Sequence, residues 1–344
     1  MIFVDGRPFS QRDEDLVALL EEPWLMSASE SFKAKPERKI TAVDSARTHC
    51  VYIFQREYAT VNPRWGVEMI GMDEATTCVG LVIRNRSDGM ISIAHFDSPK
   101  VVDAGLSQML ALVSDRSRDV ELDVHMIGGF DDAAYKVYDD DESTKRSNGY
   151  SLPLCSKIIK SLQISQRKFH MQTVCILGHN TRKDAGGHSC PIVRGFLVET
   201  LTGSIQPASF DRSSRCPDEI VRRLRVTVSS GDYRWHGKLL ETYDTMRFRF
   251  RIAACSWHAD WKYHAYSLLQ LSDLDILSRC STSPSAESPD FVENERRVFQ
   301  YLIDHPDWTE IFPERKPHVF RRIDDGEWII CDQCPKCYTR IRRC

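Results

Sequence analysis

The segment that decides the fold is Asp73-Glu74-Ala75-Thr76-Thr77-Cys78-Val79-Gly80-Leu81-Val82-Ile83, followed by Arg86-Ser87-Asp88-Gly89 and the stretch Met90–His95. Two runs rich in β-branched residues flank a turn signal, and Gly89 can adopt the positive φ that a tight turn requires. The pattern predicts an antiparallel hairpin of two strands, Thr77–Arg84 and Met90–His95. We therefore expect a strand-rich core around this hairpin.

The rest of the chain alternates strand-like and helix-like segments. Strands are predicted at Cys50–Phe54, Val120–Ile127, Met171–Leu177, Pro191–Glu199 and Arg247–Ala253. Helices are predicted at Asp13–Glu22, Gly105–Asp115, Leu154–Ile164, Asp218–Arg225 and Asp290–Asp304. The chain contains neither the GxGxxG pattern nor the GKS/T ending of a phosphate-binding loop. These elements predict an α/β sandwich core and not a nucleotide-binding βαβ fold.

Changes in composition divide the chain into four parts. A polar stretch, Ser27–Lys39, follows the first helix, and a Ser- and Pro-rich loop spans residues 281–289. A last hairpin is predicted from Val319–Ile323 and Glu327–Ile330. We expect an N-terminal extension at 1–45, a main core at 46–280, a helix and hairpin packed on it at 281–330, and a cysteine-rich tail at 331–344.

Charge and hydropathy argue against several classes of partner. The 46 Lys and Arg residues nearly balance the 49 Asp and Glu residues, so the net charge of −3 creates no field that selects nucleic acid. Apolar runs are far shorter than the roughly 20 residues of a membrane-spanning helix. Asp5 and Arg7 interrupt the apolar core that a signal peptide would need. We therefore expect a cytoplasmic protein, with the nucleus as a second location, and neither nucleic-acid nor membrane partners.

The chain has 12 cysteines, an unusually high number. Disulfide frameworks belong to short secreted chains, and Cys175 stands inside an apolar run, so reduced thiols are expected. Four cysteines close the sequence in the spacing Cys331-x2-Cys334-x2-Cys337-x6-Cys344. They form a weak candidate zinc site. The segment lacks a second CxxC pair separated by a loop long enough to wrap the ion, so a flexible, redox-exposed tail is the favoured interpretation. No cofactor is expected.

Cys78 and His95 are the candidate catalytic pair. A hairpin brings the open ends of its two strands together, and a register offset or a bulge would let the two side chains meet there. An imidazole beside a thiol can take up its proton, which matters because a free thiol has a pKa of about 8.5. The alternative is a packed thiol and an unrelated histidine at a strand end.

Several motifs together resemble the protein N-terminal asparagine amidohydrolases of eukaryotes. They are DEATTC at 73–78, AHFD at 94–97, His125-Met126-Ile127-Gly128-Gly129-Phe130, Pro191-Ile192-Val193, Ala208-Ser209-Phe210, Ser281-Thr282-Ser283-Pro284 and Phe291-Val292-Glu293. The resemblance covers about residues 45 to 330. The chain is more distantly similar to chemotaxis-receptor glutamine deamidases and cytotoxic necrotizing factors, which also pair a cysteine at a strand start with a histidine after the next strand.

The resemblance implies a four-layer α/β/β/α sandwich with mixed sheets and a cysteine hydrolase that acts on a carboxamide. Cys78 would be the nucleophile and His95 the general base. The chemotaxis deamidases carry a catalytic threonine six residues before the cysteine, where this chain has Met72. The third catalytic or oxyanion-supporting group is therefore open, and the candidates are Thr76, Thr77 and Asp97. Substrate contacts are expected from Asp73, Glu74, Gly128, Gly129, Phe130 and Ser209.

The function expected from these residues is deamidation of an N-terminal asparagine to aspartate with release of ammonia. Recognition of a protonated α-amine calls for a carboxylate-lined pocket, and Asp73, Glu74 and Asp97 are the acidic groups nearest the pair in sequence. By resemblance, the product would enter an arginylation-dependent N-degron pathway, with arginyl-transfer machinery acting downstream. Two alternatives are a deamidase of internal Gln or Asn side chains and a non-catalytic adaptor that binds protein N-termini.

Overall fold

The hairpin predicted around Gly89 lies at the centre of the structure. Strands β7 (Val79–Asn85) and β8 (Ile91–Phe96) pair antiparallel in an unbroken register that sets Gly80 opposite His95. Gly89 has a φ of 78°, as the turn requires. The computed structural model describes residues 1–9, 15–114, 120–133, 135–137, 144–146, 148–228 and 237–331.

Over the described residues, the hairpin belongs to an 11-stranded sheet that contains both parallel and antiparallel pairs. In spatial order its strands are β2 (Arg7–Pro8), β1 (Ile2–Val4), β12 (Lys168–Leu177), β9 (Glu121–Phe130), β7, β8, β5 (Glu57–Val61), β17 (Leu240–Asp244), β18 (Arg249–Ile252), β19 (His318–Arg322) and β20 (Trp328–Ile330). The first two described strands therefore form one edge of this sheet, and the hairpin of β19 and β20 forms the other.

A second mixed sheet packs against one face of the first. Its order is β3 (Arg38–Ile40), β16 (Ile205–Phe210), β15 (Phe196–Glu199), β6 (Met69–Met72) and β4 (Cys50–Tyr52). Two short pairs stand apart, β10 (Tyr135–Val137) with β11 (Thr144–Arg146), and β13 (Thr181–Lys183) with β14 (Ser189–Pro191).

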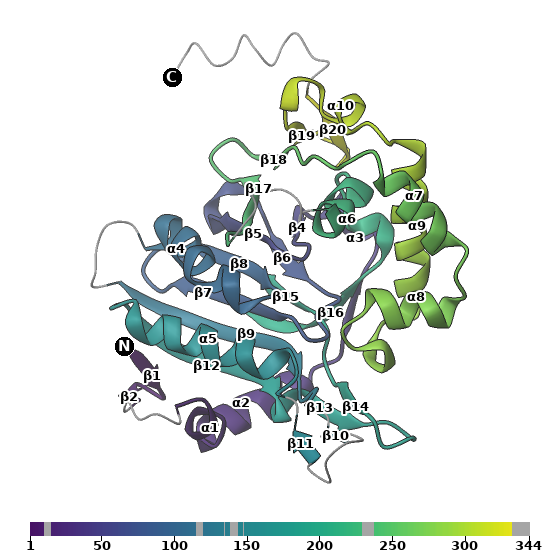
Figure 1. Cartoon of the computed structure of the whole chain (residues 1–344). Helices are drawn as coiled ribbons and strands as arrows, with labels where there is room; N and C mark the ends of the chain where they lie inside the picture. Colours follow the sequence, from purple (N-terminus) through teal and green to yellow (C-terminus); the bar gives the residue numbers. More distant parts are fainter. Residues whose placement is uncertain are drawn as a thin grey trace.

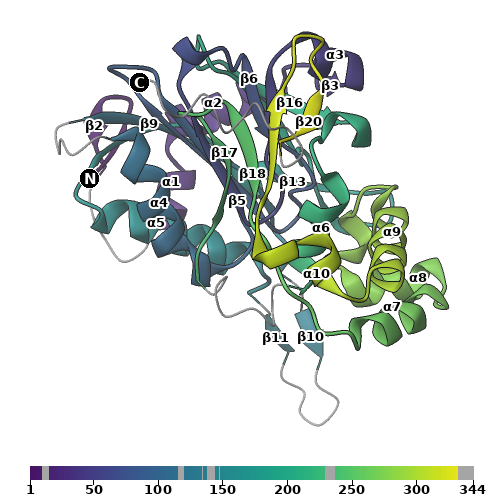
Figure 2. The ribbon, with the colours of Figure 1, turned by 90° about the horizontal axis from the view of Figure 1, so that it is seen from above.

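Helices lie on the outer face of the large sheet and beside the sandwich (Figure 1 and Figure 2). The helices on the N-terminal side are α1 (Asp15–Leu20), α2 (Pro23–Lys33), α3 (Ala42–Arg47), α4 (Val102–Val113) and α5 (Ser151–Ile164). The later helices are α6 (Glu219–Val228), α7 (Trp261–Leu269), α8 (Asp273–Cys280), α9 (Phe291–Asp304) and α10 (Trp308–Ile311). In Figure 1, α4 and α5 cross the large sheet, while α6 to α9 gather at one side of the molecule.

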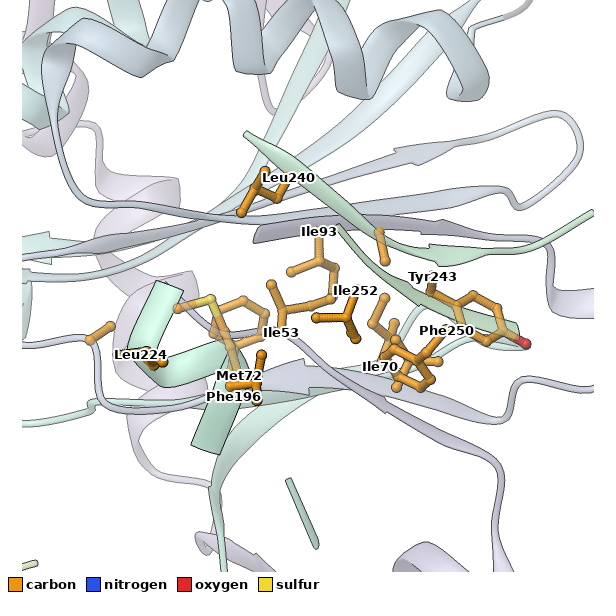
Figure 3. Close-up of a cluster of buried hydrophobic side chains, with 14 of the residues drawn as sticks. Ile53, Ile70, Met72, Ile93, Phe196, Leu224, Leu240, Tyr243, Phe250 and Ile252 are labelled. Atoms are coloured by element: carbon orange, nitrogen blue, oxygen red, sulfur yellow. The ribbon is translucent and has the colours of Figure 1, made fainter. Parts of the chain in front are cut away.

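Strand β7 is buried on both faces, and its alternation separates two cores. Val79, Leu81 and Ile83 pack with α4 and α5, whereas Val82 points into the core between the sheets, which also contains Met72 (Figure 3). Strand β7 contributes to both cores because successive residues of a strand point to opposite faces, and its residues on both faces are apolar. A side chain at Gly80 would overlap the Phe196 ring, so glycine lets the sheets approach closely here.

The expected α/β class and mixed sheets are confirmed, and the predicted hairpins and long helices are present. One helix was not predicted, and one predicted strand was wrong. The polar stretch Ser27–Lys39 belongs mostly to α2, because a narrow face of Leu25, Ser29 and Phe32 is enough to anchor a helix. The strand predicted at Pro191–Glu199 is interrupted by a loop in which Val193 N donates to Asn180 Oδ1. Among the described residues, no helix has both the length and the apolar character needed to cross a membrane.

Candidate active site

Cys78 lies where the chain passes from one sheet to the other. Strand β6 ends at Met72 in the small sheet and β7 begins at Val79 in the large one, so residues 73–78 bridge the sandwich. The Cys78 carbonyl accepts a hydrogen bond of 2.7 Å from Gly129 N. A Cβ on Gly128 would stand 2.5 Å from the same carbonyl oxygen, and Gly128 has a φ of 110°. The Gly128-Gly129 pair therefore acts by letting β9 press against the Cys78 backbone.

His95 meets Cys78 on a diagonal of the hairpin and needs no bulge. Gly80 faces His95, and Cys78 lies two residues before Gly80 on the same face of the strand. Diagonal neighbours on one face of an antiparallel pair are within reach of long side chains. The register offset or bulge that the sequence suggested is therefore absent from this part of the structure.

His95 has a buried imidazole whose nitrogens lack a hydrogen-bond partner within the described part of the chain. The side chain is 2% exposed, and neither ring nitrogen is hydrogen-bonded to another described residue. Burial lowers the pKa of His95 to about 4, although Asp97 and Glu74 act in the opposite direction. Above that pH the imidazole is uncharged and one nitrogen offers a lone pair. Such a group can accept a proton from a nearby thiol.

The surroundings of the Cys78 thiol favour its protonated form. Burial raises the pKa of the thiol well above its usual value, and the negative charges of Asp97 and Glu287 raise it further. Arg56 and a hydrogen bond with Thr77 lower the pKa, but by less. Thr77 Oγ1 also lies 3.0 Å from Thr282 Oγ1, which ties the loop after α8 to the cysteine segment. A thiol with this pKa needs a general base to react near neutral pH.

A small cavity of about 180 Å³ opens onto both side chains. Five segments that lie apart in the sequence line it: the turn at Gln55, the bridge at 73–78, strand β8 at His95, helix α6, and the chain from Cys280 to Glu295. Its other lining residues include Tyr52, Phe54, Thr76, Thr77, Arg223, Val226, Thr227, Ser281, Thr282, Glu287, Ser288 and Phe291. A larger groove of about 570 Å³ between α4 and α5 is lined by no cysteine or histidine among the described residues.

Asp73 and Glu74 line the cavity, but arginines pair their charges. Asp73 accepts hydrogen bonds from Tyr52 Oη at 2.5 Å, Phe210 N at 2.7 Å and Arg215 at 3.1 Å. Glu74 lies 2.5 Å from Arg215 and 3.0 Å from Arg223, with a φ of 61°. Burial raises the pKa of Asp73 to about 6 despite Arg215. This ion network holds the bridge segment in place.

The remaining predicted residues fall into four environments. Thr76 and Thr77 line the cavity, so both remain candidates for a third catalytic group. Asp97 is 6% exposed at its side chain and pairs with Arg56 at 2.6 Å, but it does not line the cavity. Phe130 is buried away from it against Cys190 and Ala286. Ser209 lines a neighbouring cavity that shares Asp73 and Glu74 with the first.

The cysteine tail lies almost entirely outside the described residues. Cys331 is described and partly buried, whereas Cys334, Cys337 and Cys344 are not described. No group of three or more His, Cys, Asp or Glu side chains that could hold a metal ion occurs within the described ranges. The weak metal prediction at the tail therefore stays a prediction.

Similarity to known proteins agrees with this geometry. A family model described as protein N-terminal asparagine amidohydrolase matches residues 39–330. A protein of that name from Arabidopsis thaliana is 51% identical over 96% of this chain and 100% of its own length. Proteins of the same name from Sus scrofa and Mus musculus are 31% and 30% identical, each over 81% of this chain. They are covered over 82% and 83% of their own lengths.

The chain belongs to the protein N-terminal asparagine amidohydrolase family. The sequence predicted Cys78 and His95 as a catalytic pair, and the structure adds polar residues of the same cavity that the sequence did not predict, among them one amide and two carboxylates. These three are Gln55, Glu287 and Glu295. Glu287 and Glu295 lie more than 200 positions from Cys78, and no local pattern links them to it. The family resemblance at residues 281–284 and 291–293 was the one sequence feature that could have pointed to Glu287 and Glu295, because these motifs lie next to both residues.

Proposed function

We propose that this protein deamidates the N-terminal asparagine of proteins or peptides to aspartate, with Cys78 as the nucleophile and His95 as the general base. The observation that supports the proposal most strongly is the shared cavity. A protonated thiol and an unpartnered neutral imidazole open into a small space that also contains the carboxylates of Glu287 and Glu295. The family name of the relatives points to the same substrate.

The two added carboxylates can recognise a free α-ammonium group. Glu287 accepts a hydrogen bond from Ser281 Oγ, and burial raises its pKa. Burial also raises the pKa of Glu295 to about 7, against a smaller opposing effect of Arg223. Neither carboxylate forms a salt bridge within the described part of the chain, in contrast to Asp73 and Glu74. A cation that enters the cavity gives them a partner and removes an electrostatic penalty.

The reaction follows from these positions in two steps. The Cys78 thiol transfers its proton to His95 and its sulfur attacks the carboxamide carbon of the substrate. The carbon–nitrogen bond breaks, and ammonia leaves with the proton from His95. His95 then takes a proton from water, whose oxygen attacks the thioester and releases aspartate and the Cys78 thiol.

The acidic lining favours this substrate over the internal Gln or Asn side chains of the alternative function. An internal side chain brings no cation to balance Glu287 and Glu295, whereas a chain terminus does. We also include in the proposal that the N-terminal aspartate product enters an arginylation-dependent N-degron pathway, in the cytoplasm or nucleus.

Ammonia release from three peptides tests the proposal. Peptides that begin with Asn should release ammonia, whereas those that begin with acetyl-Asn or Gln should not. The Cys78→Ala variant should lose at least about 10⁴-fold in rate, because removal of a nucleophile leaves only binding effects. Cys216→Ala is the matched control, since Cys216 is a partly buried thiol that does not line the cavity. Turnover of acetyl-Asn would favour the internal deamidase, and binding without ammonia release would favour the adaptor.

A further inference from the structure

The turn between β4 and β5 brings one amide side chain to the cavity. Gln55 lies in this turn and lines the cavity together with Cys78 and His95. The next residue, Arg56, has a φ of 62° and donates from its backbone N to His95 O at 3.0 Å. The turn is therefore tied directly to the strand that carries the proposed base.

The orientation of the Gln55 amide is fixed by Asp97. Gln55 Nε2 donates to Asp97 Oδ2 at 2.9 Å, and Arg56 Nε donates to the same oxygen at 2.6 Å. An ionised carboxylate only accepts hydrogen bonds, so a reversed amide would bring two acceptor oxygens together. Gln55 Oε1 is consequently the atom left over, and no donor among the described residues reaches it. A residue that lines the cavity thus has an oriented acceptor without a donor among the described residues.

We propose that Gln55 is a specificity-determining residue, whose Oε1 accepts a hydrogen bond from the –NH₂ group of the substrate carboxamide. The carboxamide of asparagine has two N–H donors, whereas the carboxylate of the aspartate product has none. The product would therefore place a negative oxygen against Oε1, beside the charge of Asp97. The contact favours substrate over product and helps the product leave. Asp97 is a positioning residue that acts through Gln55.

The inference rests on the proposed function, and a binding experiment separates the two. In the Cys78→Ala background, the dissociation constants of one peptide with N-terminal Asn and of its N-terminal Asp counterpart are measured by calorimetry. Gln55→Met keeps the length of the side chain and removes both amide groups, and Gln55→Ala is a second variant. We expect Gln55→Met to weaken binding of the Asn peptide about tenfold, the value of one lost hydrogen bond. Binding of the Asp peptide should be unchanged or tighter.

Gln300→Met is the matched control. Gln300 Nε2 donates to Asp304 Oδ1 at 2.9 Å on the exposed side of α9, the same kind of amide–carboxylate bond without a cavity. It should leave both dissociation constants unchanged. The inference is overturned if folded Gln55→Met and Gln55→Ala bind the Asn and Asp peptides with an unchanged ratio of dissociation constants, whether both affinities stay the same or both fall equally. Ammonia release by the unmodified protein is read separately, so a failure there overturns the proposed function instead.

The positioning role of Asp97 has a readout of its own. Asparagine at position 97 offers a donor as well as an acceptor, so Gln55 is no longer held in one orientation. Asp97→Asn should lower the same affinity ratio, and adding Gln55→Met should lower it no further, because both changes remove one interaction. Additive losses in the double variant would overturn the role of Asp97.

Discussion

Two groups of carboxylates border the cavity, and they differ in what balances their charge. Asp73 and Glu74 are paired with arginines from the same protein. Glu287 and Glu295 form no salt bridge among the described residues and have raised pKa values, mainly through burial. The first group is part of the folded framework, whereas the second is available to a positively charged ligand. Closeness to Cys78 in sequence is thus a poor guide to which acid lacks a partner within the described part of the protein.

The arginine-paired group extends into the core through Glu57. This residue is 1% exposed at the start of β5 and is hydrogen-bonded by two buried arginines of α6, Arg222 at 2.6 Å and Arg225. The Arg222 guanidinium also lies over the Phe54 ring, 4.7 Å from its centroid. The same helix thus supplies charge partners to the core and, through Arg223, to the cavity wall.

The largest effect is expected from breaking this framework. Glu57→Ala leaves two buried guanidinium groups without their anion, which should lower the free energy of unfolding by about 3–5 kcal/mol. Chemical denaturation followed by circular dichroism measures the loss. Glu314→Ala is the control, because Glu314 pairs with Lys316 where both side chains are exposed, 75% and 68%. That pair should contribute no more than about 1 kcal/mol. Equal losses in the two variants would contradict the assignment of Glu57 to the framework.

An intermediate effect is expected at the unpaired carboxylates. Glu287→Gln should raise KM for peptides with N-terminal Asn by roughly 10- to 100-fold, because a charge-assisted hydrogen bond to the ammonium is lost. Its unfolding free energy should change little, in contrast to Glu57→Ala. Steady-state kinetics and denaturation on the same preparation provide both numbers. Glu293→Gln is the control on the neighbouring helix, since Glu293 pairs with Arg212 on the exposed surface. Destabilisation without a change in KM would place Glu287 in the framework instead.

The smallest effect concerns pH. With a pKa of about 7, Glu295 is ionised above that value and neutral below it, so kcat/KM should rise with pH through about 7. At pH 6, about one tenth of the molecules would carry the charge, which predicts a roughly tenfold lower kcat/KM than on the plateau. His95, with a pKa of about 4, remains neutral throughout this range. Glu295→Gln should abolish this limb of the pH profile.

The pH dependence of protein stability provides a second test of the raised pKa of Glu295. Because the folded-state pKa of Glu295 exceeds its ordinary value, the folded protein holds this proton more tightly than the unfolded chain. The contribution of Glu295 to the free energy of unfolding therefore falls as pH rises from the ordinary carboxyl range to about 7, and it stays constant above that pH. Glu295→Gln should be more stable than the unmodified protein at pH 8 and equally stable at pH 4. A pH-independent difference between the two proteins would argue against a raised pKa.

Local patterns predicted the elements that have strong periodicity or clear turn signals. The hairpin around Gly89 and the helices at α4 and α5 follow from alternation and helical spacing. Helix α2 was missed because its buried face is narrow and includes Ser29, which donates to Val174 O at 2.9 Å. Burial of a hydrogen-bonded serine depends on a partner about 145 residues away and leaves no local trace.

The residues of the candidate site also differ in how far local sequence patterns could place them. Cys78 and His95 lie on one hairpin, so local pairing places them together. Glu287 comes from a loop whose approach depends on α8 and α9 docking against the sandwich, a contact that no spacing in the sequence encodes. The charges of Asp73 and Glu74 were predicted to face substrate, yet Arg215 lies far along the chain and pairs with both. Proximity in sequence identified the residues, but only the fold assigned their partners.

The size of the cavity limits which proteins can serve as substrates. A volume of about 180 Å³ is equivalent to roughly six water molecules at ~30 Å³ each, which leaves room for little more than one residue. The segments around Cys280 and Glu287 border this space, and in the proposed reaction the first residue of the substrate would occupy it. A polypeptide whose first residues are packed in its own fold would have to expose them before they could enter. The proposed function therefore predicts that exposure of the chain end, as much as the identity of its first residue, decides when a protein is processed.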